Sequence, residues 1–139
     1  MPDERLVKVI WAAGFLDGEG TFTISGAKNS RFVAIMAAQV DLRPLNVLRD
    51  LWGGSITERP PDSRHPNNRK QYVWVISTRK VIVCLNEIVT YLVLKGDQAR
   101  LLLEYSDTIG LPGFRVNKSM LPIRGLISDK IYLLNKRGI

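Results

Sequence analysis

A short helix that is apolar on every face is the feature that most constrains the fold of this chain. We predict a helix over residues 5–17 with Asp3 as its N-cap, and the stretch from Val9 to Leu16 holds only apolar residues and glycine. A helix on the surface of an ordinary two-layer domain has one apolar stripe and one polar face. This helix is therefore expected to be buried from two sides.

Two glycines near the end of the helix predict a close helix–helix contact. Gly14 and Gly18 are four positions apart and share one helix face, where a second helix can approach closely. Glu19 follows directly. If the partner is the same helix of a second copy, a two-fold axis brings the two Glu19 carboxylates together, and they repel unless a cation lies between them. Hard divalent cations accept such oxygen ligands, and two or more of them can support phosphodiester hydrolysis.

The charge of the chain indicates an anionic partner. Its 139 residues include 20 Lys and Arg against 13 Asp and Glu, which gives a net charge of +7. Residues 20–40 and 59–86 together hold eight of the basic residues and one acid. This asymmetry predicts one electropositive surface suited to a phosphate backbone. An ordinary solvated basic face is the alternative.

Several classes of protein are excluded by composition. The single cysteine, Cys84, rules out an intrachain disulfide framework, and with one histidine, His65, it rules out a zinc-finger cluster. No apolar run approaches the ~20 residues of a membrane helix. The acids at positions 3, 4, 17 and 19 do not fit a signal peptide. We therefore expect an intracellular chain, in the cytoplasm or an organelle, that is neither secreted nor membrane-bound.

Two hairpins separated by helices are predicted along the rest of the chain. The expected strands are 21–25, 31–40, 55–59 and 72–77. The expected later helices are 42–52 capped by Asp41 and ended by Gly53 and Gly54, 79–91 capped by Thr78, 98–105 capped by Asp97, and one within 126–135. This order predicts an α+β fold in which helices cover one face of a four-stranded antiparallel sheet. Residues 1–139 are expected to form one domain.

Hydrogen-bonding side chains alternate along the predicted strands, an arrangement typical of β-ribbon readout in the major groove of DNA. The residues expected on the sheet face away from the helices are Thr21, Thr23, Ser25, Arg31, Gln39, Ser55, Thr57, Arg59, Tyr72 and Trp74. The further expected DNA contacts lie in the hairpin loops and are Lys28, Asn29, Arg64, Arg69 and Lys70. A solvated sheet face without a ligand is also polar, and this alternative stays open.

The nine residues from Ala12 to Gly20, AAGFLDGEG, resemble the LAGLIDADG motif of homing endonucleases. Gly14, Asp17, Gly18 and Gly20 fit the motif, and Glu19 takes the place of its second acid. The predicted order of elements over residues 5–105 is similar to the αββαββα core of that family. The resemblance implies this core with a saddle-shaped sheet, followed here by extra C-terminal helices.

The resemblance also implies an activity. A chain with one motif is similar to the homodimeric members, which cleave both strands of double-stranded DNA at a long, near-palindromic site and are often encoded in introns. It implies a metal-dependent phosphodiester hydrolase that uses Mg²⁺ or Mn²⁺, binds Ca²⁺ without cleavage, and needs no small-molecule cofactor. The alternative is a non-cleaving relative on the same scaffold, either an RNA splicing maturase or a transcription regulator.

The resemblance finally implies roles for individual residues. Glu19 and the backbone carbonyl of Gly18 would ligate the metals, and Lys95 would stabilise the attacking hydroxide or the transition-state charge. Gln39 would help to organise water, and Asp17 would cap or hydrogen-bond near the helix end. The expected catalytic residues are Glu19, Lys95 and Gln39, and the expected dimer interface is Ala13, Gly14, Asp17 and Gly18. Leu42 and Asn46 stand where relatives often have Gln and Arg.

Overall fold

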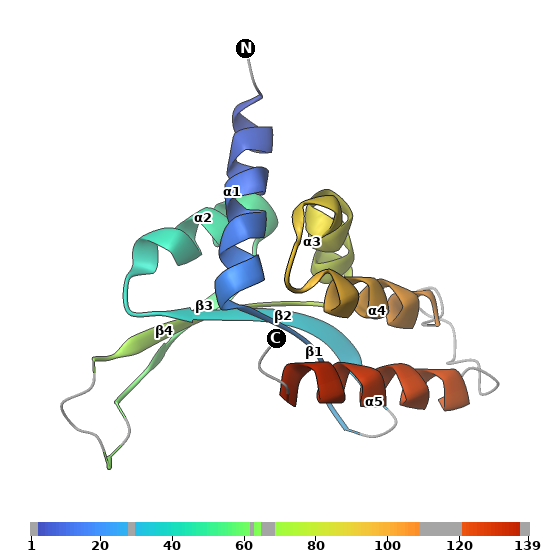
Figure 1. Cartoon of the computed structure of the whole chain (residues 1–139). Coiled ribbons are helices and arrows are strands. Elements are labelled where there is room, and N and C mark those ends of the chain that lie inside the picture. Colours follow the sequence, from blue (N-terminus) through green and yellow to red (C-terminus); the bar gives the residue numbers. More distant parts are fainter. Residues whose placement is uncertain (1–2, 28–29, 62, 65–68, 109–120, 137–139) are drawn as a thin grey trace.

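The computed structural model describes residues 3–27, 30–61, 63–64, 69–108 and 121–136. Within them the chain forms a mixed α+β structure, as predicted (Figure 1). Its elements are α1 (Glu4–Glu19), β1 (Gly20–Ser25), β2 (Phe32–Gln39), α2 (Leu42–Trp52), β3 (Ser55–Arg59), β4 (Gln71–Ser77), α3 (Arg79–Ile88), the 3-10 turn η1 (Val89–Tyr91), α4 (Gly96–Asp107) and α5 (Leu121–Lys136).

The four strands form one antiparallel sheet with the order β1-β2-β4-β3. Helices α1 to α4 stand on one side of this curved sheet, whereas α5 runs beside the edge strand β1 and next to α4 (Figure 1). The two hairpin turns therefore lie at opposite ends of the sheet. This arrangement confirms the predicted architecture. None of the helices in the described segments combines the length and apolar character that a membrane crossing requires.

Local signals in the sequence set several of the boundaries correctly. Asp3 and Asp41 cap α1 and α2, because each carboxylate accepts the backbone N–H two residues later, at 2.9 Å. Helix α2 ends at Trp52 with Gly53 as its C-cap, and the φ angles of Gly53 and Gly54 are 75° and 97°, a region that favours glycine. A side chain at Gly54 would also lie against the backbone carbonyl of Val75.

Two of the predicted caps are absent. Thr78 occupies the N-cap position of α3 but makes no side-chain cap bond, and its φ angle is 54°. Helix α4 begins at Gly96 with Lys95 at the N-cap, so Asp97 lies inside the first turn rather than before it. The N–H groups that lead into α4 instead find their acceptor on α1, as described below.

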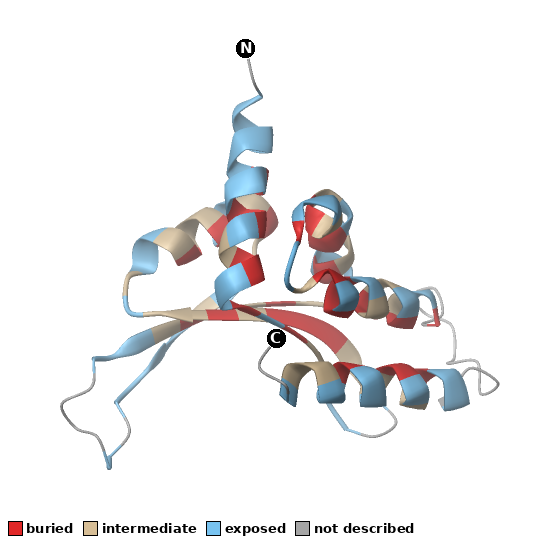
Figure 2. Cartoon of the chain, viewed as in Figure 1, coloured by how far each residue is buried: buried red, intermediate tan, exposed pale blue. Residues whose placement is uncertain are grey.

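The core lies between the sheet and the helices, where Figure 2 shows the buried residues on the inward sides of both. Its largest fully buried side chains include Trp74, Phe22 and Leu16. The indole N–H of Trp74 donates to the carbonyl of Gly53 at 2.9 Å, so the one polar group of this side chain is satisfied. Burial of these large apolar surfaces is the main force that holds the helices on the sheet.

The inner side of α1 also carries a polar contact near its N-terminus. The guanidinium of Arg5 donates to the carboxylate of Glu87 on α3 at 2.8 Å, and the indole N–H of Trp52 donates to the same carboxylate oxygen at 3.1 Å. Burial acts to raise the pKa of Glu87, but these two bonds outweigh it and hold the pKa below its ordinary value. The contact joins α1, α2 and α3.

The strand register corrects the prediction for one face of the sheet. Residues directly opposite on neighbouring strands point to the same face, and residues two apart on a strand do so too. Phe22, in the core, pairs with Ile35, which places Gln39 on the same helix-covered face. The pairs Gln39 with Tyr72 and Ala37 with Trp74 extend that face across β4. The prediction that Gln39, Tyr72 and Trp74 lie away from the helices is therefore wrong.

The opposite side of the sheet, which we call the open face, keeps the other predicted strand residues. Thr21 and Thr23 pair with Met36 and Ala34, and Thr57 pairs with Val73. The predicted residues that the register confirms on the open face are Thr21, Thr23, Ser25, Ser55, Thr57 and Arg59. The residues there that the sequence reading missed are Phe32, Ala34, Met36, Ala38, Gln71, Val73, Val75 and Ser77.

Candidate active site

The candidate active site lies where α1 ends and β1 begins, because several polar groups from distant parts of the chain meet there. Glu19 is the last residue of α1, and both it and Gly18 are exposed. Lys95 comes from the segment between η1 and α4, and its ammonium donates to the carbonyl of Gly20. The structure thus brings together the predicted residues Gly18, Glu19 and Lys95.

Asp17 is the buried acid of the motif. Its side chain accepts the backbone N–H groups of Val93 at 3.1 Å, of Leu94 at 2.8 Å and of Lys95 at 2.9 Å. Burial acts to raise the pKa of Asp17, but the three N–H groups and the charge of Lys95 outweigh it, so this pKa lies below its ordinary value. The expectation that Asp17 hydrogen-bonds near the helix end is confirmed.

Lys95 and Glu19 carry opposite charges at this site, and the charge of Glu19 acts on Lys95. Burial lowers the pKa of the half-buried Lys95, and the nearby charges of Asp17 and Glu19 offset part of that effect. The ammonium of Lys95 lies at the end of α1, where it donates to the carbonyl of Gly20. Such a group can stabilise negative charge that develops on a bound phosphate.

Gln39 lies at the end of β2, near the same region. Ala37 pairs with Gly20, and Gln39 is two residues further along β2, a step of about 7 Å along the strand. It is half-buried on the helix-covered face. Gln39 therefore lies on the helix-covered side, near the end of α1, and not on the open face.

The donor chemistry at this helix end fits a hard divalent cation. Mg²⁺, Mn²⁺ and Ca²⁺ prefer carboxylate and carbonyl oxygens, which Glu19 and the backbone of Gly18 can supply. Asp17 is engaged by three N–H groups. Across the part of the chain that the structure describes, no three acidic, histidine or cysteine side chains gather into a metal site. Glu19 and the carbonyl of Gly18 are therefore the candidate metal ligands at this helix end.

The outward side of α1 presents an apolar surface to solvent. Gly14 and Gly18 are exposed, and no atom lies within 4 Å of a Cβ built on either. The large side chains on the same side are Val7, Ile10 and Trp11, which are 52%, 45% and 44% exposed. We call these five residues the outer face of α1. The glycines leave the backbone accessible, as the predicted close contact requires.

Two residues predicted for the dimer interface face inward instead. Ala13 is fully buried in the core, and Asp17 is 8% exposed with its oxygens bonded to the segment before α4. They follow the inner side of the helix, which packs on the sheet. Gly14 and Gly18 thus remain available for a partner, whereas Ala13 offers it no surface.

Val93 and Leu94 form a further apolar surface that the motif did not reveal. Their backbone N–H groups point to Asp17, and their side chains are 85% and 60% exposed. The signal in the sequence was two large apolar residues directly before the turn at Lys95 and Gly96. They lie close to the end of α1 because Asp17 holds them there.

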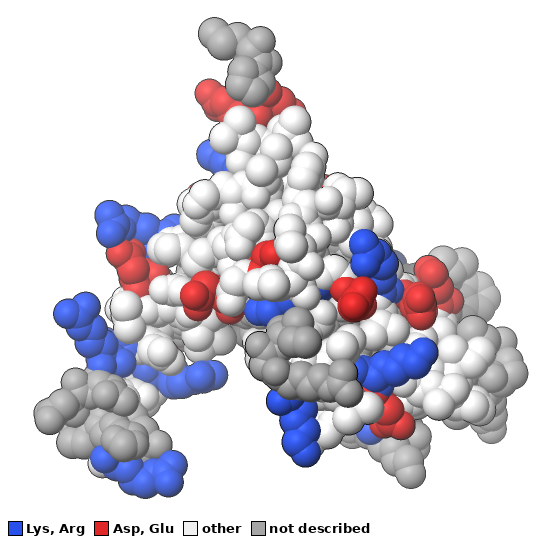
Figure 3. Space-filling view, in the orientation of Figure 1, with Lys and Arg blue, Asp and Glu red and all other residues white. Residues whose placement is uncertain are grey.

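Basic side chains flank the underside of the molecule. In Figure 3 they project beside the β3–β4 hairpin at the lower left and around α5 at the lower right. Arg59, Arg69 and Lys70 are exposed at or next to that hairpin, and Arg64 is exposed within its loop. Lys28 and Asn29 lie outside the described residues.

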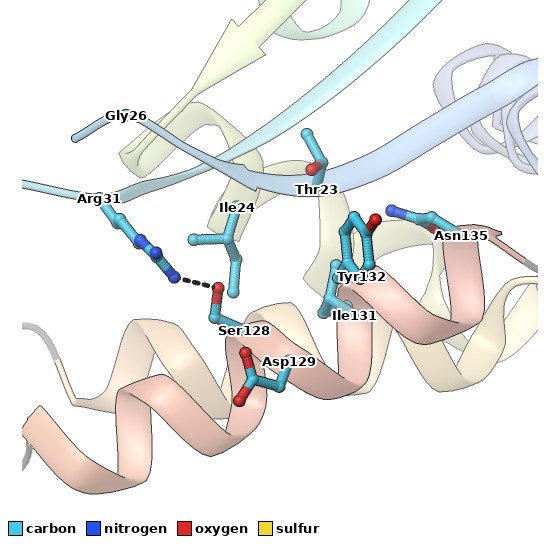
Figure 4. A pocket seen from close by; sticks show the side chains of 9 residues that line it. All are labelled: Thr23, Ile24, Gly26, Arg31, Ser128, Asp129, Ile131, Tyr132 and Asn135. Atoms are coloured by element: carbon cyan, nitrogen blue, oxygen red, sulfur yellow. Dashed lines mark hydrogen bonds between the residues drawn. The ribbon is translucent and has the colours of Figure 1, made fainter. Parts of the chain in front are cut away.

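Arg31 takes a different position from the one predicted. It lies just before β2, and its guanidinium donates to the hydroxyl of Ser128 on α5 at 2.6 Å. Figure 4 shows this contact at one end of a groove of about 410 Å³ between β1 and α5, with Thr23 and Tyr132 on its walls. Arg31 therefore ties the first hairpin to α5, a contact that the alternation in the strand could not reveal.

Comparison with known proteins identifies the fold. No family model and no curated protein matches the sequence. Among solved structures, the homing endonuclease I-CvuI in complex with its target matches with a TM-score of 0.74 at 23% identity, over 94% of this chain and 83% of that chain. The archaeal intron-encoded homing endonuclease I-Vdi141I, complexed with DNA, matches with a TM-score of 0.74 at 18% identity, over 92% of this chain and 84% of that chain.

A third match, the LAGLIDADG homing endonuclease I-GzeII in complex with its DNA target, has a TM-score of 0.65 at 16% identity. It covers 86% of this chain and 43% of that chain. The resemblance drawn from nine residues is thus confirmed at the level of the whole structure. This chain has the LAGLIDADG homing endonuclease fold.

Proposed function

We propose that this chain is a sequence-specific endonuclease that cleaves double-stranded DNA as a homodimer with divalent metal. The observation that carries the proposal is the exposed carboxylate of Glu19 at the end of a helix whose outer face is apolar and notched by glycine. If a second copy packs on this face, its Glu19 would lie beside the first, and the two carboxylates could bind metal together.

The outer face of α1 supports a second copy as the partner. Val7, Ile10 and Trp11 form an apolar surface that water does not favour, and Gly14 and Gly18 allow two backbones to come close. Val93 and Leu94 extend the apolar surface near the catalytic end of the helix. Self-association through α1 would place the two Glu19 carboxylates near one two-fold axis.

The residues at the helix end divide the chemical work in this proposal. Glu19 and the carbonyl of Gly18 would hold Mg²⁺, which supplies activation of water and stabilisation of the leaving oxygen. The ammonium of Lys95 would stabilise negative charge on the scissile phosphate. Gln39 would hydrogen-bond to water beside the scissile phosphate. Glu19 is present and exposed, which favours cleavage over a non-cleaving binding role.

The open face and the basic side chains around it would bind the DNA. The solved relatives I-CvuI and I-Vdi141I are DNA complexes, and that of I-CvuI was obtained in the presence of Ca. Thr21, Thr57 and Arg59 on the sheet would face the major groove of the DNA, and Arg69 and Lys70 near the second hairpin would contact its phosphates. Binding of this kind weakens steeply with salt, by about 10³-fold or more between about 50 and 200 mM when six or more phosphates are contacted.

The experiment that tests the proposal uses a randomised duplex library. The protein is incubated with the library and Mg²⁺, and the cut ends are sequenced. We expect a pseudo-palindromic consensus, because two identical subunits read two half-sites. Recovery of bound but uncut duplexes would favour the non-cleaving alternative, and no enrichment at any salt concentration would contradict DNA recognition altogether.

Glu19→Gln tests the assigned metal ligand. The amide keeps the shape but loses the charge, so cleavage of the selected site should fall by about 1,000-fold or more. Binding in Ca²⁺-free buffer should persist. Glu104→Gln is the matched control. It removes an exposed carboxylate near the C-terminal end of α4, away from Lys95, and the variant should cleave as the wild type does. Full cleavage by Glu19→Gln in Mg²⁺ would show that Glu19 is not the metal ligand.

A further inference from the structure

The segment that carries Lys95 is held by an acid from a distant part of the chain. Three consecutive N–H groups, those of Val93, Leu94 and Lys95, point to the carboxylate of Asp17 at 2.8–3.1 Å. The N–H of Leu94 lies within 3.0 Å of both carboxylate oxygens. Charge-assisted bonds to a buried carboxylate are among the stronger ones in proteins, so this anchor is stiff.

Among the described residues next to this segment, neither the side chain of Lys95 nor that of Asp97 takes over this anchoring role. Lys95 is the N-cap of α4 and makes no side-chain cap bond, and the nearest acid in the helix, Asp97, is exposed and pairs with Arg100 at 3.4 Å. The N–H groups before α4 would otherwise lack acceptors at a partly buried position. Asp17 therefore supplies from α1 the cap that α4 does not supply itself.

The side chain of Lys95 is held at its other end as well. Its ammonium donates to the carbonyl of Gly20, the residue that follows Glu19. The backbone of Lys95 is thus fixed by Asp17, and its charged tip is fixed one residue beyond Glu19. Both anchors come from the same short stretch at the end of α1.

We propose that Asp17 is a positioning residue that holds the ammonium of Lys95 beside Glu19. Its oxygens are already taken by the three N–H groups, and its side chain is buried, whereas Glu19 is exposed. The two acids of the motif therefore have separate duties. The importance of this position for cleavage rests on the proposed function, but the placement of Lys95 can be measured without it.

The first test measures the wild-type protein and an isosteric variant without any DNA. Amide hydrogen exchange should show protection at Val93, Leu94 and Lys95, and Asp17→Asn should reduce that protection about tenfold or more because the amide replaces an acceptor by a donor. Reductive methylation at fixed pH, followed by peptide mass analysis, should modify Lys95 several-fold faster in Asp17→Asn.

Asp97→Asn is the matched control for this test. It makes the same chemical change two residues from Lys95 but at a carboxylate that does not contact the 93–95 backbone. We expect its exchange and methylation rates to equal those of the wild type. Unprotected amides at residues 93–95 in the wild type would contradict the proposed anchor, and this measurement does not depend on the folding of a variant. Methylation of Lys95 at the same rate in Asp17→Asn as in the wild type would contradict it too.

The second test is a double-mutant cycle on cleavage of the selected site. Asp17→Asn should lower the single-turnover rate about 10- to 100-fold, as loss of an outer partner of a catalytic site does, while Ca²⁺-supported DNA binding is unchanged. In a Lys95→Met background the same change should have little further effect, because Asp17 acts through Lys95. An equal further loss in that background would contradict the proposal. A wild-type protein that never cleaves would instead refute the proposed function and leave the exchange and methylation results to decide the anchor.

Discussion

The two sides of α1 have similar composition but different surroundings. On the inner side Val9, Ala12 and Leu16 are at most 2% exposed, whereas on the outer face Val7, Ile10 and Trp11 are each about half exposed. Both sides are apolar, so hydrophobicity alone does not separate them. An all-apolar sequence therefore predicts that both sides of the helix become buried, but it does not show what buries each side. The structure shows that this chain buries the inner side itself and leaves the outer face exposed.

The largest expected effect comes from the inner side. Leu16→Ala removes a fully buried side chain and should lower the free energy of unfolding by about 2–5 kcal/mol, because it leaves a cavity under α1. Urea denaturation at several protein concentrations measures it. The loss should be independent of protein concentration, because Leu16 contacts only its own chain. A loss of unfolding free energy that depends on protein concentration would show that Leu16 also contributes to self-association, which would contradict the distinction between the inner side and the outer face of α1.

The outer face should show the opposite pattern. Gly18→Leu meets open space within the chain, so it should leave the folded monomer intact, but it should weaken self-association at least about 100-fold by holding the two helices apart. Sedimentation velocity measures the change, and Gly125→Leu on α5, where a Cβ also meets nothing within 4 Å, is the matched control. An unchanged dimer mass for Gly18→Leu would exclude this face as the interface.

The smallest expected effect concerns the polar contact on the inner side. Glu87→Gln weakens the bond to Arg5 and should lower stability by less than about 1 kcal/mol at pH 7, since the ion pair is partly exposed. The folded-state pKa of Glu87 lies below its ordinary value of 4.5, so its contribution is present above pH 4.5 and is lost as the pH falls through the lower folded value. Chemical denaturation between pH 6 and 3 should therefore give a flatter profile for the variant, and parallel profiles would contradict the assignment.

Much of the fold was predictable because the signals were local. The caps Asp3 and Asp41, the glycine pair at the end of α2 and the strand Ser55–Arg59 all have the predicted positions. The face of β2 and β4 was not predictable in the same way. These central strands are apolar on both sides, and a shift of one residue exchanges the two faces, so the pattern did not decide between them.

The site was predicted in part for the same reason. The motif singled out Glu19, Gly18 and Asp17, and the resemblance added Lys95, which the structure brings to the same helix end. The prediction that Trp74 contacts DNA is wrong, because its side chain is fully buried. An aromatic residue in a strand suits a core and a binding face equally well, so the sequence pattern did not decide between them. The contact of Arg31 with Ser128 joins residues 97 positions apart, and no local pattern encodes it.

The bonds from Asp17 to the segment before α4 also bear on the order of folding. They join residues 76 to 78 positions apart, so forming them closes a long loop, which costs more conformational entropy than the contacts within either hairpin. A nascent or truncated chain that stops before residue 93 would display the exposed acid at the end of α1 without its lysine. The pairing of Lys95 with the end of α1 thus becomes available only once the chain extends through residue 95.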